Sequence, residues 1–469
     1  MAAATAVAAA ATGAAAAAIA ADAAAIAVVV AAAAAAAGVA SVNLDRFQSE
    51  LTPRRVMLPG GAVFLSVPVP AAQAMSFGVW LRRGSASEPV GQEGVTHFLE
   101  HIVFKGTATR SSLEVAEAFD AVGAMVDAFT TKDYVAFTLR VLPEFFSTAL
   151  AVLADMVLRP ALEPEAVLLE QDVICEEIQE ALDTPEDRLH DAYASYLYGP
   201  RGRGRPILGS PESVRAATPE SLRAAHQALF AGPNVVLAVG GNLAVGVEDE
   251  ILAAFDGLVP AATPFADVAT DPPGERAAGE LVIESPILQT YFEIGNRAVA
   301  AGHPDRVPVL LVSNLLGGGM SSRIFQAVRE REGLAYTVYN YTDIGRDGGL
   351  VSCAGSCSPD KEARVREVVA AEYRRLLAEG PTADELASNK AQIKSHLVFA
   401  LEGAHNQMSR AAKNELYFGR FMPLAELVAQ VDAVDREVVM RCAADWFDPD
   451  RMVFAAHRPA KTRRQRPRT

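Results

Sequence analysis

Hydrophobic and polar positions along the chain form two long blocks that predict the same order of elements. In the first block, the pattern predicts a strand over 74–81, helices over 94–104 and 111–122, β-structure over 128–141, a helix over 143–158 and a long amphipathic helix after residue 159. In the second block, it predicts a strand over 288–295, helices over 307–316 and 321–332, β-structure over 335–356, a helix over 359–378 and a long helix from residue 380. This repetition indicates an internal duplication.

The duplication predicts an α+β fold of two homologous domains, each a largely antiparallel sheet with helices packed on one face. We expect the first domain over residues 42–257 and the second over 281–458. The segment 258–280 is rich in Pro, Ala and Asp, which is typical of an extended linker. A short basic tail over 459–469 ends the sequence.

Residues 1–41 are almost all alanine, and their place in the protein has two interpretations. The apolar run over 23–40 reaches the lower length limit of a membrane span, but alanine is weakly hydrophobic. No Lys or Arg precedes Arg46, so the basic region of a signal peptide is missing. We therefore expect a low-complexity extension or an over-long translation start, and a cytoplasmic protein. Export or membrane anchoring through this segment is the alternative.

Composition narrows the class of protein further. Of the 469 residues, 51% are hydrophobic and 21% are charged, which excludes wholesale disorder. A net charge of −15 argues against a nucleic-acid-binding surface over the body of the chain. Four cysteines in so long a chain are no disulfide framework, and we expect free, mostly buried thiols in a reducing compartment.

The segment "GVTHFLEHIVFKG" over 94–106 carries the strongest chemical signal. His97 and His101 are four residues apart, so they share one face of a helix and can ligate one zinc ion. Glu100 lies between them and can take a proton from a water molecule on that metal without being a ligand itself. Apolar residues surround all three, which argues against two ordinary surface histidines.

A catalytic zinc needs a third protein ligand, and the long helix near residue 170 offers four candidates: Glu170, Glu176, Glu177 and Glu180. Helical spacing places Glu170 and Glu177 on the apolar face of this helix and the other two on the solvated stripe. A carboxylate on a buried face needs a partner, so Glu177 is the candidate ligand. Glu170, two turns earlier, can hydrogen-bond a ligating histidine.

These residues and their flanking text, "GSASEPVGQEGVTHFLEHIVFKGT" from Gly84 and "VICEEIQEALDTPEDRLHDA" from Val173, resemble the pitrilysin/insulinase family of zinc peptidases. The resemblance spans about residues 52–457 and is nearest to short members such as mitochondrial processing peptidase subunits and their bacterial relatives. It implies one zinc per chain, bound by His97, His101 and Glu177, with Glu100 as general base and Glu170 in support. The second domain would carry no metal.

The second block contains "GGGMSSRIFQAVREREGLAYTVYNY" from Gly317. The resemblance implies that Arg329 and Tyr336 hold the substrate and stabilise the tetrahedral intermediate; a cation and a phenol can both donate hydrogen bonds to an oxyanion. Without the resemblance, the pair could equally be a surface Arg and a half-buried Tyr. One departure is Asp127, where the family usually has Asn; if this side chain contacts the substrate backbone, an acid there would alter specificity.

The function expected from all this is a zinc endopeptidase that hydrolyses peptides or unfolded polypeptide segments. Substrates would bind by strand addition near Ala128–Thr131, as the resemblance implies. The alternative is a non-catalytic or regulatory subunit of the same fold that partners an active peptidase. The resemblance also implies a homodimer, or a heterodimer with a homologous subunit, because this chain supplies one half of the four-domain enclosure of long family members.

Overall fold

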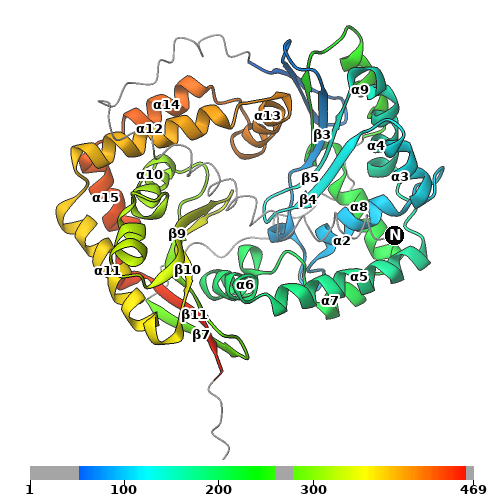
Figure 1. Cartoon of the computed structure of the whole chain (residues 1–469). Helices are drawn as coiled ribbons and strands as arrows, with labels where there is room; N and C mark the ends of the chain where they lie inside the picture. Colours follow the sequence, from blue (N-terminus) through cyan, green and yellow to red (C-terminus); the bar gives the residue numbers. More distant parts are fainter. Residues whose placement is uncertain (1–51, 259–277, 461–469) are drawn as a thin grey trace, which may run out of the picture.

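The computed structural model describes residues 52–258 and 278–460 of the chain. The Ala-rich extension over 1–41 lies outside the described residues, as do nearly all of the linker expected over 258–280 and of the tail expected over 459–469. The described residues form two domains, each built on one β-sheet, that lie side by side (Figure 1).

The first domain contains a six-stranded sheet and eight α-helices within the described residues. Its strands are β1 (Arg54–Met57), β2 (Val63–Pro68), β3 (Met75–Leu81), β4 (Met125–Thr130), β5 (Val135–Val141) and β6 (Val235–Gly241). Its helices are α2 (Val95–Ile102), α3 (Ser112–Asp120), α4 (Phe146–Leu158), α5 (Pro164–Asp183), α6 (Pro185–Tyr198), α7 (Pro211–Arg215), α8 (Pro219–Leu229) and α9 (Val247–Ala254).

The second domain repeats this plan on a five-stranded sheet. Its strands are β7 (Gly279–Ser285), β8 (Thr290–Ala298), β9 (Ala335–Ile344), β10 (Gly349–Cys357) and β11 (Val453–Pro459). Its helices are α10 (Arg306–Gly317), the π-helix η7 (Phe325–Arg331), α11 (Glu362–Glu379), α12 (Ala383–Phe399), α13 (Ala404–Phe418), α14 (Leu424–Asp432) and α15 (Arg436–Trp446). Strand β7 begins inside the end of the expected linker.

The order of strands demonstrates the duplication. The first sheet runs β1-β2-β6-β3-β5-β4 and the second β7-β11-β8-β10-β9, so the two orders coincide once β1 is set aside. In each sheet one pair is parallel, β2 with β6 and β7 with β11, and every other pair is antiparallel. The predicted α+β fold with two homologous, largely antiparallel sheets is confirmed. Strands β4 and β9 are the matching sheet edges.

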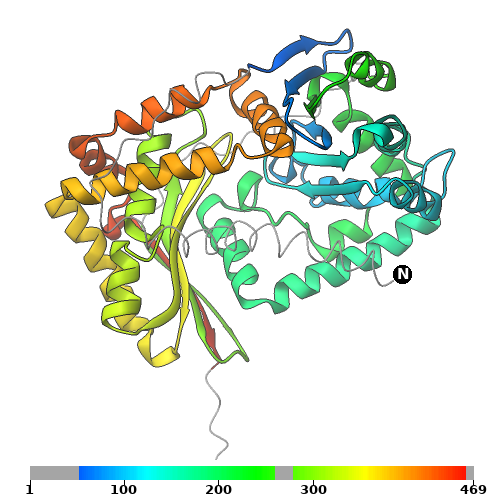
Figure 2. The same ribbon diagram turned by 45° about the horizontal axis from the view of Figure 1, so that its top comes forward.

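Helices cover both faces of the central strands of each sheet, because each domain also packs one helix on the sheet of the other domain. The domain's own helices cover one face of its sheet. The other face of the first sheet packs against α13 of the second domain, through Met408, Ala411, Ala412 and Leu416 (Figures 1 and 2). In return, α6 of the first domain places Leu189, Tyr193 and Leu197 against β10 and β11. Burying such apolar side chains contributes about 1.5–3 kcal/mol for each large one.

A buried carboxylate that pairs with two partly exposed arginines fixes helix α13 on the first sheet. Glu415 of α13 is 3% exposed and accepts hydrogen bonds from Arg55 on β1 at 2.9 and 3.0 Å. Arg82, just after β3, donates to the same carboxylate at 2.9 Å. The alternation of apolar and polar positions predicted the helices but not this exchange, since it depends on contacts between distant segments.

Candidate metal centre

Three of the expected site residues, His97, Glu100 and His101, lie on the eight-residue helix α2. His97 and His101 lie on one face, one turn apart, with ring centroids 4.5 Å apart. His97 is 2% exposed and Glu100 is 9% exposed, because apolar neighbours such as Phe98 pack the helix into the core. The chain therefore holds three polar functional groups in a largely buried position.

Helix α5 brings Glu177 to these histidines. The Glu177 Oε2 atom lies 3.7 Å from His97 Nε2 and 3.6 Å from His101 Nε2. Glu176, the neighbouring candidate, is exposed to solvent, as the helical spacing indicated. In residues 52–258 and 278–460, His97, His101 and Glu177 form the one group of at least three His, Cys, Asp or Glu side chains whose ligand atoms converge, all within 4.8 Å of one another.

This donor set fits zinc. Two imidazole nitrogens and one carboxylate oxygen are ligands typical of a catalytic zinc site. Ligand atoms on a tetrahedral zinc with bonds of roughly 2.0–2.1 Å lie about 3.4 Å apart. The two separations of 3.6 and 3.7 Å between the glutamate oxygen and the histidine nitrogens approach this value. Three protein ligands also leave one coordination position open for water or substrate.

Glu170 supports the site from the position that the sequence predicted. Its Oε2 atom lies 3.1 Å from His101 Nδ1, which fixes the ring and leaves Nε2 directed at Glu177. Lys105 Nζ lies 2.6 Å from the other carboxylate oxygen. Sequence reasoning missed Lys105, which lies in the 3₁₀ turn Val103–Lys105 directly after α2, although its position four residues after His101 was an available signal.

Burial and charge shift the two histidines in opposite directions. Burial, with the neighbouring His101, holds the pKa of His97 well below its usual range, so this ring is neutral as a metal ligand must be. Burial also acts to lower the pKa of His101, but the hydrogen bond to Glu170 and the nearby carboxylates raise it overall. The Nδ1 atom of His97 is buried without a hydrogen-bond partner in the described part of the chain.

Glu100 is oriented by a residue of the sheet edge. Thr130 on β4 donates a hydrogen bond from Oγ1 to Glu100 Oε2 at 2.6 Å, which leaves Oε1 for another partner. Burial raises the pKa of Glu100 to about 7, and the charge of Asp127 acts in the same direction. Asp127 itself is exposed on β4. Sequence reasoning did not single out Thr130 as a partner of Glu100, because this contact depends on how β4 lies against α2.

Comparisons with known proteins identify the family. Residues 63–210 match the family model described as insulinase, peptidase family M16, and residues 216–393 match the model described as the peptidase M16 inactive domain. The chain belongs to the insulinase family. A protein named as an uncharacterized zinc protease of Streptomyces coelicolor is 34% identical over 403 residues, which is 84% of this chain and 87% of the relative. Zinc protease YmxG of Bacillus subtilis, also named as uncharacterized, is 33% identical over 381 residues, 81% of this chain and 92% of the relative.

Solved structures show the same fold. A crystal structure titled as a peptidase M16 inactive domain from Pseudomonas fluorescens superposes with a TM-score of 0.80 at 22% identity, covering 89% of this chain and all of that chain. A protease from Helicobacter pylori gives a TM-score of 0.78 at 20% identity, covering 87% of this chain and all of that chain. The first family match contains His97, Glu100, His101 and Glu177, and the second contains Arg329 and Tyr336.

The structure brings Arg329 and Tyr336 together in the second domain. The guanidinium of Arg329 lies 4.6 Å from the ring centroid of Tyr336, and its Nη1 donates to the Tyr336 carbonyl oxygen at 3.0 Å. Arg329 sits on the π-helix η7, and a register shift in the β9–β10 ladder leaves Tyr336 bulged out and 80% exposed. Such irregularities re-aim side chains and are frequent at functional sites. Among the described residues, the contacts of this pair stay within the second domain.

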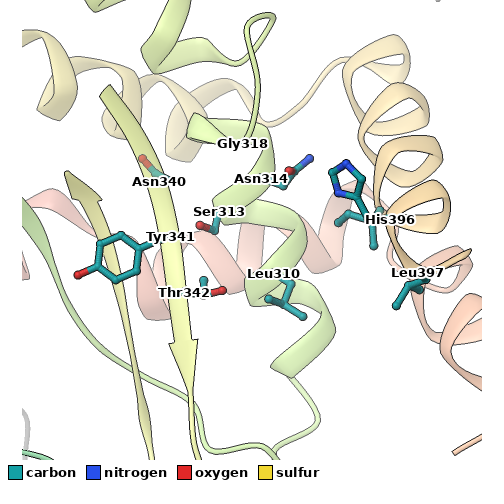
Figure 3. A pocket seen from close by; sticks show the side chains of 10 residues that line it. Leu310, Ser313, Asn314, Gly318, Asn340, Tyr341, Thr342, His396 and Leu397 are labelled. Carbon is teal, nitrogen blue, oxygen red and sulfur yellow. The ribbon is translucent and has the colours of Figure 1, made fainter. Parts of the chain in front are cut away.

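The second domain contains a pocket at the place that corresponds to the metal centre. A cavity of about 300 Å³ lies between α10, α12 and β9, the counterparts of α2, α5 and β4 (Figure 3). When the buried positions of α2 and α10 are aligned, Leu310, Ser313 and Asn314 occupy the places of His97, Glu100 and His101. Asn314 Nδ2 donates to Asn389 Oδ1 of α12 at 2.6 Å, where the first domain has the contact between His101 and Glu170. In the second domain, amides therefore take the places of one histidine ligand, His101, and of its supporting carboxylate, Glu170.

Two further expectations concern the rest of the chain. The four cysteines are free, and three of them are buried: Cys353, Cys357 and Cys442. Among the helices of residues 52–258 and 278–460, none combines the length and the apolar character needed to cross a bilayer. The apolar run over 23–40 lies outside the residues that this statement covers.

Proposed function

We propose that this chain is a zinc-dependent endopeptidase that hydrolyses peptides or unfolded polypeptide segments, with Glu100 as general base. The observation that carries the proposal is the convergence of His97, His101 and Glu177 within 4.8 Å, beside a buried glutamate that is not part of the ligand set. Membership of the insulinase family and the names of the zinc protease relatives support it.

His97, His101 and Glu177 would hold one zinc ion per chain. Zinc, when bound, supplies a Lewis acid that activates water and polarises the carbonyl of the scissile peptide bond. Glu170 keeps the His101 ring oriented by accepting from Nδ1, and Lys105 balances the charge of Glu170. These contacts hold the ligand atoms in place before substrate arrives.

Glu100 moves the proton. The hydroxyl of Thr130 occupies Oε2, so Oε1 is the atom that accepts a proton from the attacking water. The same carboxyl group then donates this proton to the nitrogen of the leaving amine, which a neutral amine requires. Burial raises the pKa of Glu100 to about 7 in the metal-free chain, so a buried carboxyl group that can hold a proton lies beside the ligand set.

The edge strand β4 would bind the substrate backbone. It ends the order of the first sheet, and one side of the strand pairs with β5. An extended peptide that adds to the free side of Ala128–Thr131 would lie along the strand that orients Glu100. Main-chain hydrogen bonding accepts many sequences, so peptides and unfolded segments are the expected class of substrate.

Arg329 and Tyr336 complete the proposed machinery. Both can donate hydrogen bonds to the oxyanion of the tetrahedral intermediate, and Tyr336 is well exposed for this contact. Because they belong to the second domain, we propose that they act on the site of a partner subunit in a homodimer, or in a heterodimer with a homologous chain.

The proposed function is tested by metal content and hydrolysis together. The purified chain should contain one zinc per molecule and cleave an internally quenched unstructured peptide. Chelation should abolish cleavage and added Zn²⁺ should restore it, whereas His101→Ala should lose both zinc and cleavage. A chain that binds zinc yet cleaves no peptide, alone or with a homologous subunit, would instead support the non-catalytic alternative.

A further inference from the structure

Helix α2 begins without a cap of its own. Its N-cap residue is Gly94, which has no side chain to accept a hydrogen bond from the first turn. Gly94 has a φ angle of 86°, and a Cβ atom there would lie 2.5 Å from the carbonyl oxygen of Leu208. A capping side chain at this position is therefore excluded both by backbone conformation and by space.

Glu88 supplies the missing cap from six residues upstream. Its Oε2 atom accepts from the Gly94 backbone N–H at 2.8 Å. Its Oε1 atom accepts from the Thr96 backbone N–H at 2.8 Å and from the Thr96 hydroxyl at 2.5 Å. The carboxylate thus satisfies two orphan donors at the positive end of the helix, directly before His97.

Glu88 is itself held in place. It is completely buried, and Arg205, which is 3% exposed, donates from Nη1 to its backbone oxygen at 2.9 Å. The turn just before it, Ser85–Ser87, is hydrogen-bonded through its backbone to Thr131 and Lys132. These residues directly follow Thr130, the hydrogen-bond partner of Glu100. One continuous set of contacts therefore joins the start of α2 to the end of β4.

A second buried carboxylate fixes the loop that follows α2 and the 3₁₀ turn Val103–Lys105. Asp155 on α4 accepts at Oδ2 from the hydroxyls of Thr107 and Thr109, at 2.7 and 2.8 Å, and from Arg110 Nη1 at 2.7 Å. Arg159 pairs with its other oxygen at 2.8 Å. The loop fixed in this way begins two residues after Lys105, which contacts Glu170.

Buried carboxylates are costly, so their use at the start of one short helix and in the loop shortly after it calls for a reason. Burial raises the pKa of Glu88 to about 7, against the opposing effect of its hydrogen bonds. A helix of eight residues is marginal by itself, because few hydrogen bonds compensate the cost of nucleation. Yet α2 must hold His97, Glu100 and His101 at fixed positions relative to Glu177 on another helix.

We propose that Glu88 and Asp155 are positioning residues of the metal centre. Glu88 holds the start of α2 and Asp155 the loop that follows its 3₁₀ extension, so that His97 and His101 stay directed at Glu177 before zinc binds. This inference rests on the proposed function. It assigns the two carboxylates a role in metal affinity beyond their contribution to folding, since misdirected ligands must be reordered when the metal binds.

The test compares the zinc affinity of matched variants by chelator competition, with melting temperature of the metal-free protein measured alongside. Glu88→Gln keeps the side-chain volume but places an amide NH₂ group against the N–H donors at the start of α2. Asp155→Asn likewise places an amide NH₂ group against the donors of the loop after α2. Each should weaken zinc binding about tenfold, the lower end of the range for residues that hold a metal ligand indirectly. The control Asp435→Ala removes the cap of α15 in the second domain, and should lower the melting temperature while leaving zinc affinity unchanged.

A second pair of variants covers the case in which Glu88→Gln does not fold. Thr96→Val removes only the hydroxyl donor to Glu88, whereas Thr96→Ser keeps it, so zinc affinity should fall in the first and be retained in the second. Wild-type zinc affinity in folded Glu88→Gln and Asp155→Asn, or in Thr96→Val, would overturn the inference alone. A wild-type chain that binds no zinc would overturn the proposed function as well.

Discussion

Replacing Glu100 with glutamine separates proton transfer from metal binding. The two side chains have the same shape, but glutamine has one acceptor oxygen instead of two. Thr130 donates to Glu100 Oε2 at 2.6 Å, and the glutamine oxygen can take over that bond. The NH₂ group then stands where Oε1 stood and faces the attacking water as a donor. No atom of the side chain remains to accept the proton.

The expected loss of activity equals the contribution of the general base that Glu100→Gln removes. General-base catalysis contributes about 10²–10⁴-fold, which corresponds to about 2.7–5.4 kcal/mol of activation free energy. Folding should be little affected, because the exchange removes a buried charge and keeps the hydrogen bond to Thr130. The three ligand atoms belong to His97, His101 and Glu177, so the metal should stay.

The assay is steady-state cleavage of an internally quenched peptide, with zinc measured in the same samples. Glu100→Gln should lower kcat at least about 100-fold, with KM and the zinc content close to wild type. Thr130→Val keeps the Glu100 carboxylate and removes only the hydrogen bond that orients it, so kcat should fall less than in Glu100→Gln. Near-wild-type turnover in a folded, zinc-containing Glu100→Gln protein would refute the mechanism.

Three further predictions test the rest of the arrangement. N-methylation of a substrate amide that pairs with β4 should slow cleavage about fivefold for one lost hydrogen bond of ~1 kcal/mol, and equal rates for all methylated positions would contradict strand addition. Glu415→Ala leaves two partly exposed arginines without their shared carboxylate, and should cost about 1.5–3 kcal/mol of stability in a denaturation experiment, with an unchanged midpoint as the contrary result. Mixing a Glu100→Gln subunit with an Arg329→Ala/Tyr336→Ala subunit should partly restore activity if the pair serves the partner's site. No recovery despite proven subunit exchange would mean that it does not.

Local periodicity explains why the sequence predicted so much of the site. The spacing of His97 and His101, and the apolar face that singles out Glu170 and Glu177 over Glu176, depend only on residues one or two turns apart. The positions of helices are predictable for the same reason. The helix predicted over 307–316, for example, corresponds to α10, Arg306–Gly317. Family resemblance, rather than periodicity, supplied Arg329 and Tyr336.

Contacts between distant segments were outside the reach of the same reasoning. The bond from Thr130 to Glu100 requires the position of β4 against α2, and the cap from Glu88 requires a turn that returns to the helix start. The sequence does not reveal that α6 and α13 each pack on the sheet of the other domain, because either helix would show the same amphipathic periodicity against either sheet. The segment expected to be helical over 321–332 contains the π-helix η7, a distortion to which the spacing of apolar residues is insensitive.

The duplication supports the proposal that the charged residues of the first domain serve a metal. Glu100, Glu170 and Glu177 gather around two imidazoles in a largely buried place, and Lys105 neutralises only part of their charge. Such a group is unfavourable without further positive charge, and a divalent cation at the converging atoms would supply it. The second domain has the same frame of two helices and an edge strand, yet Asn314 and Asn389 bond each other there as neutral amides. The same frame therefore forms in the second domain without carboxylates at the places of Glu100 and Glu170, which argues that the fold itself does not depend on these two charges. Their retention there is the strongest structural argument that they serve a metal.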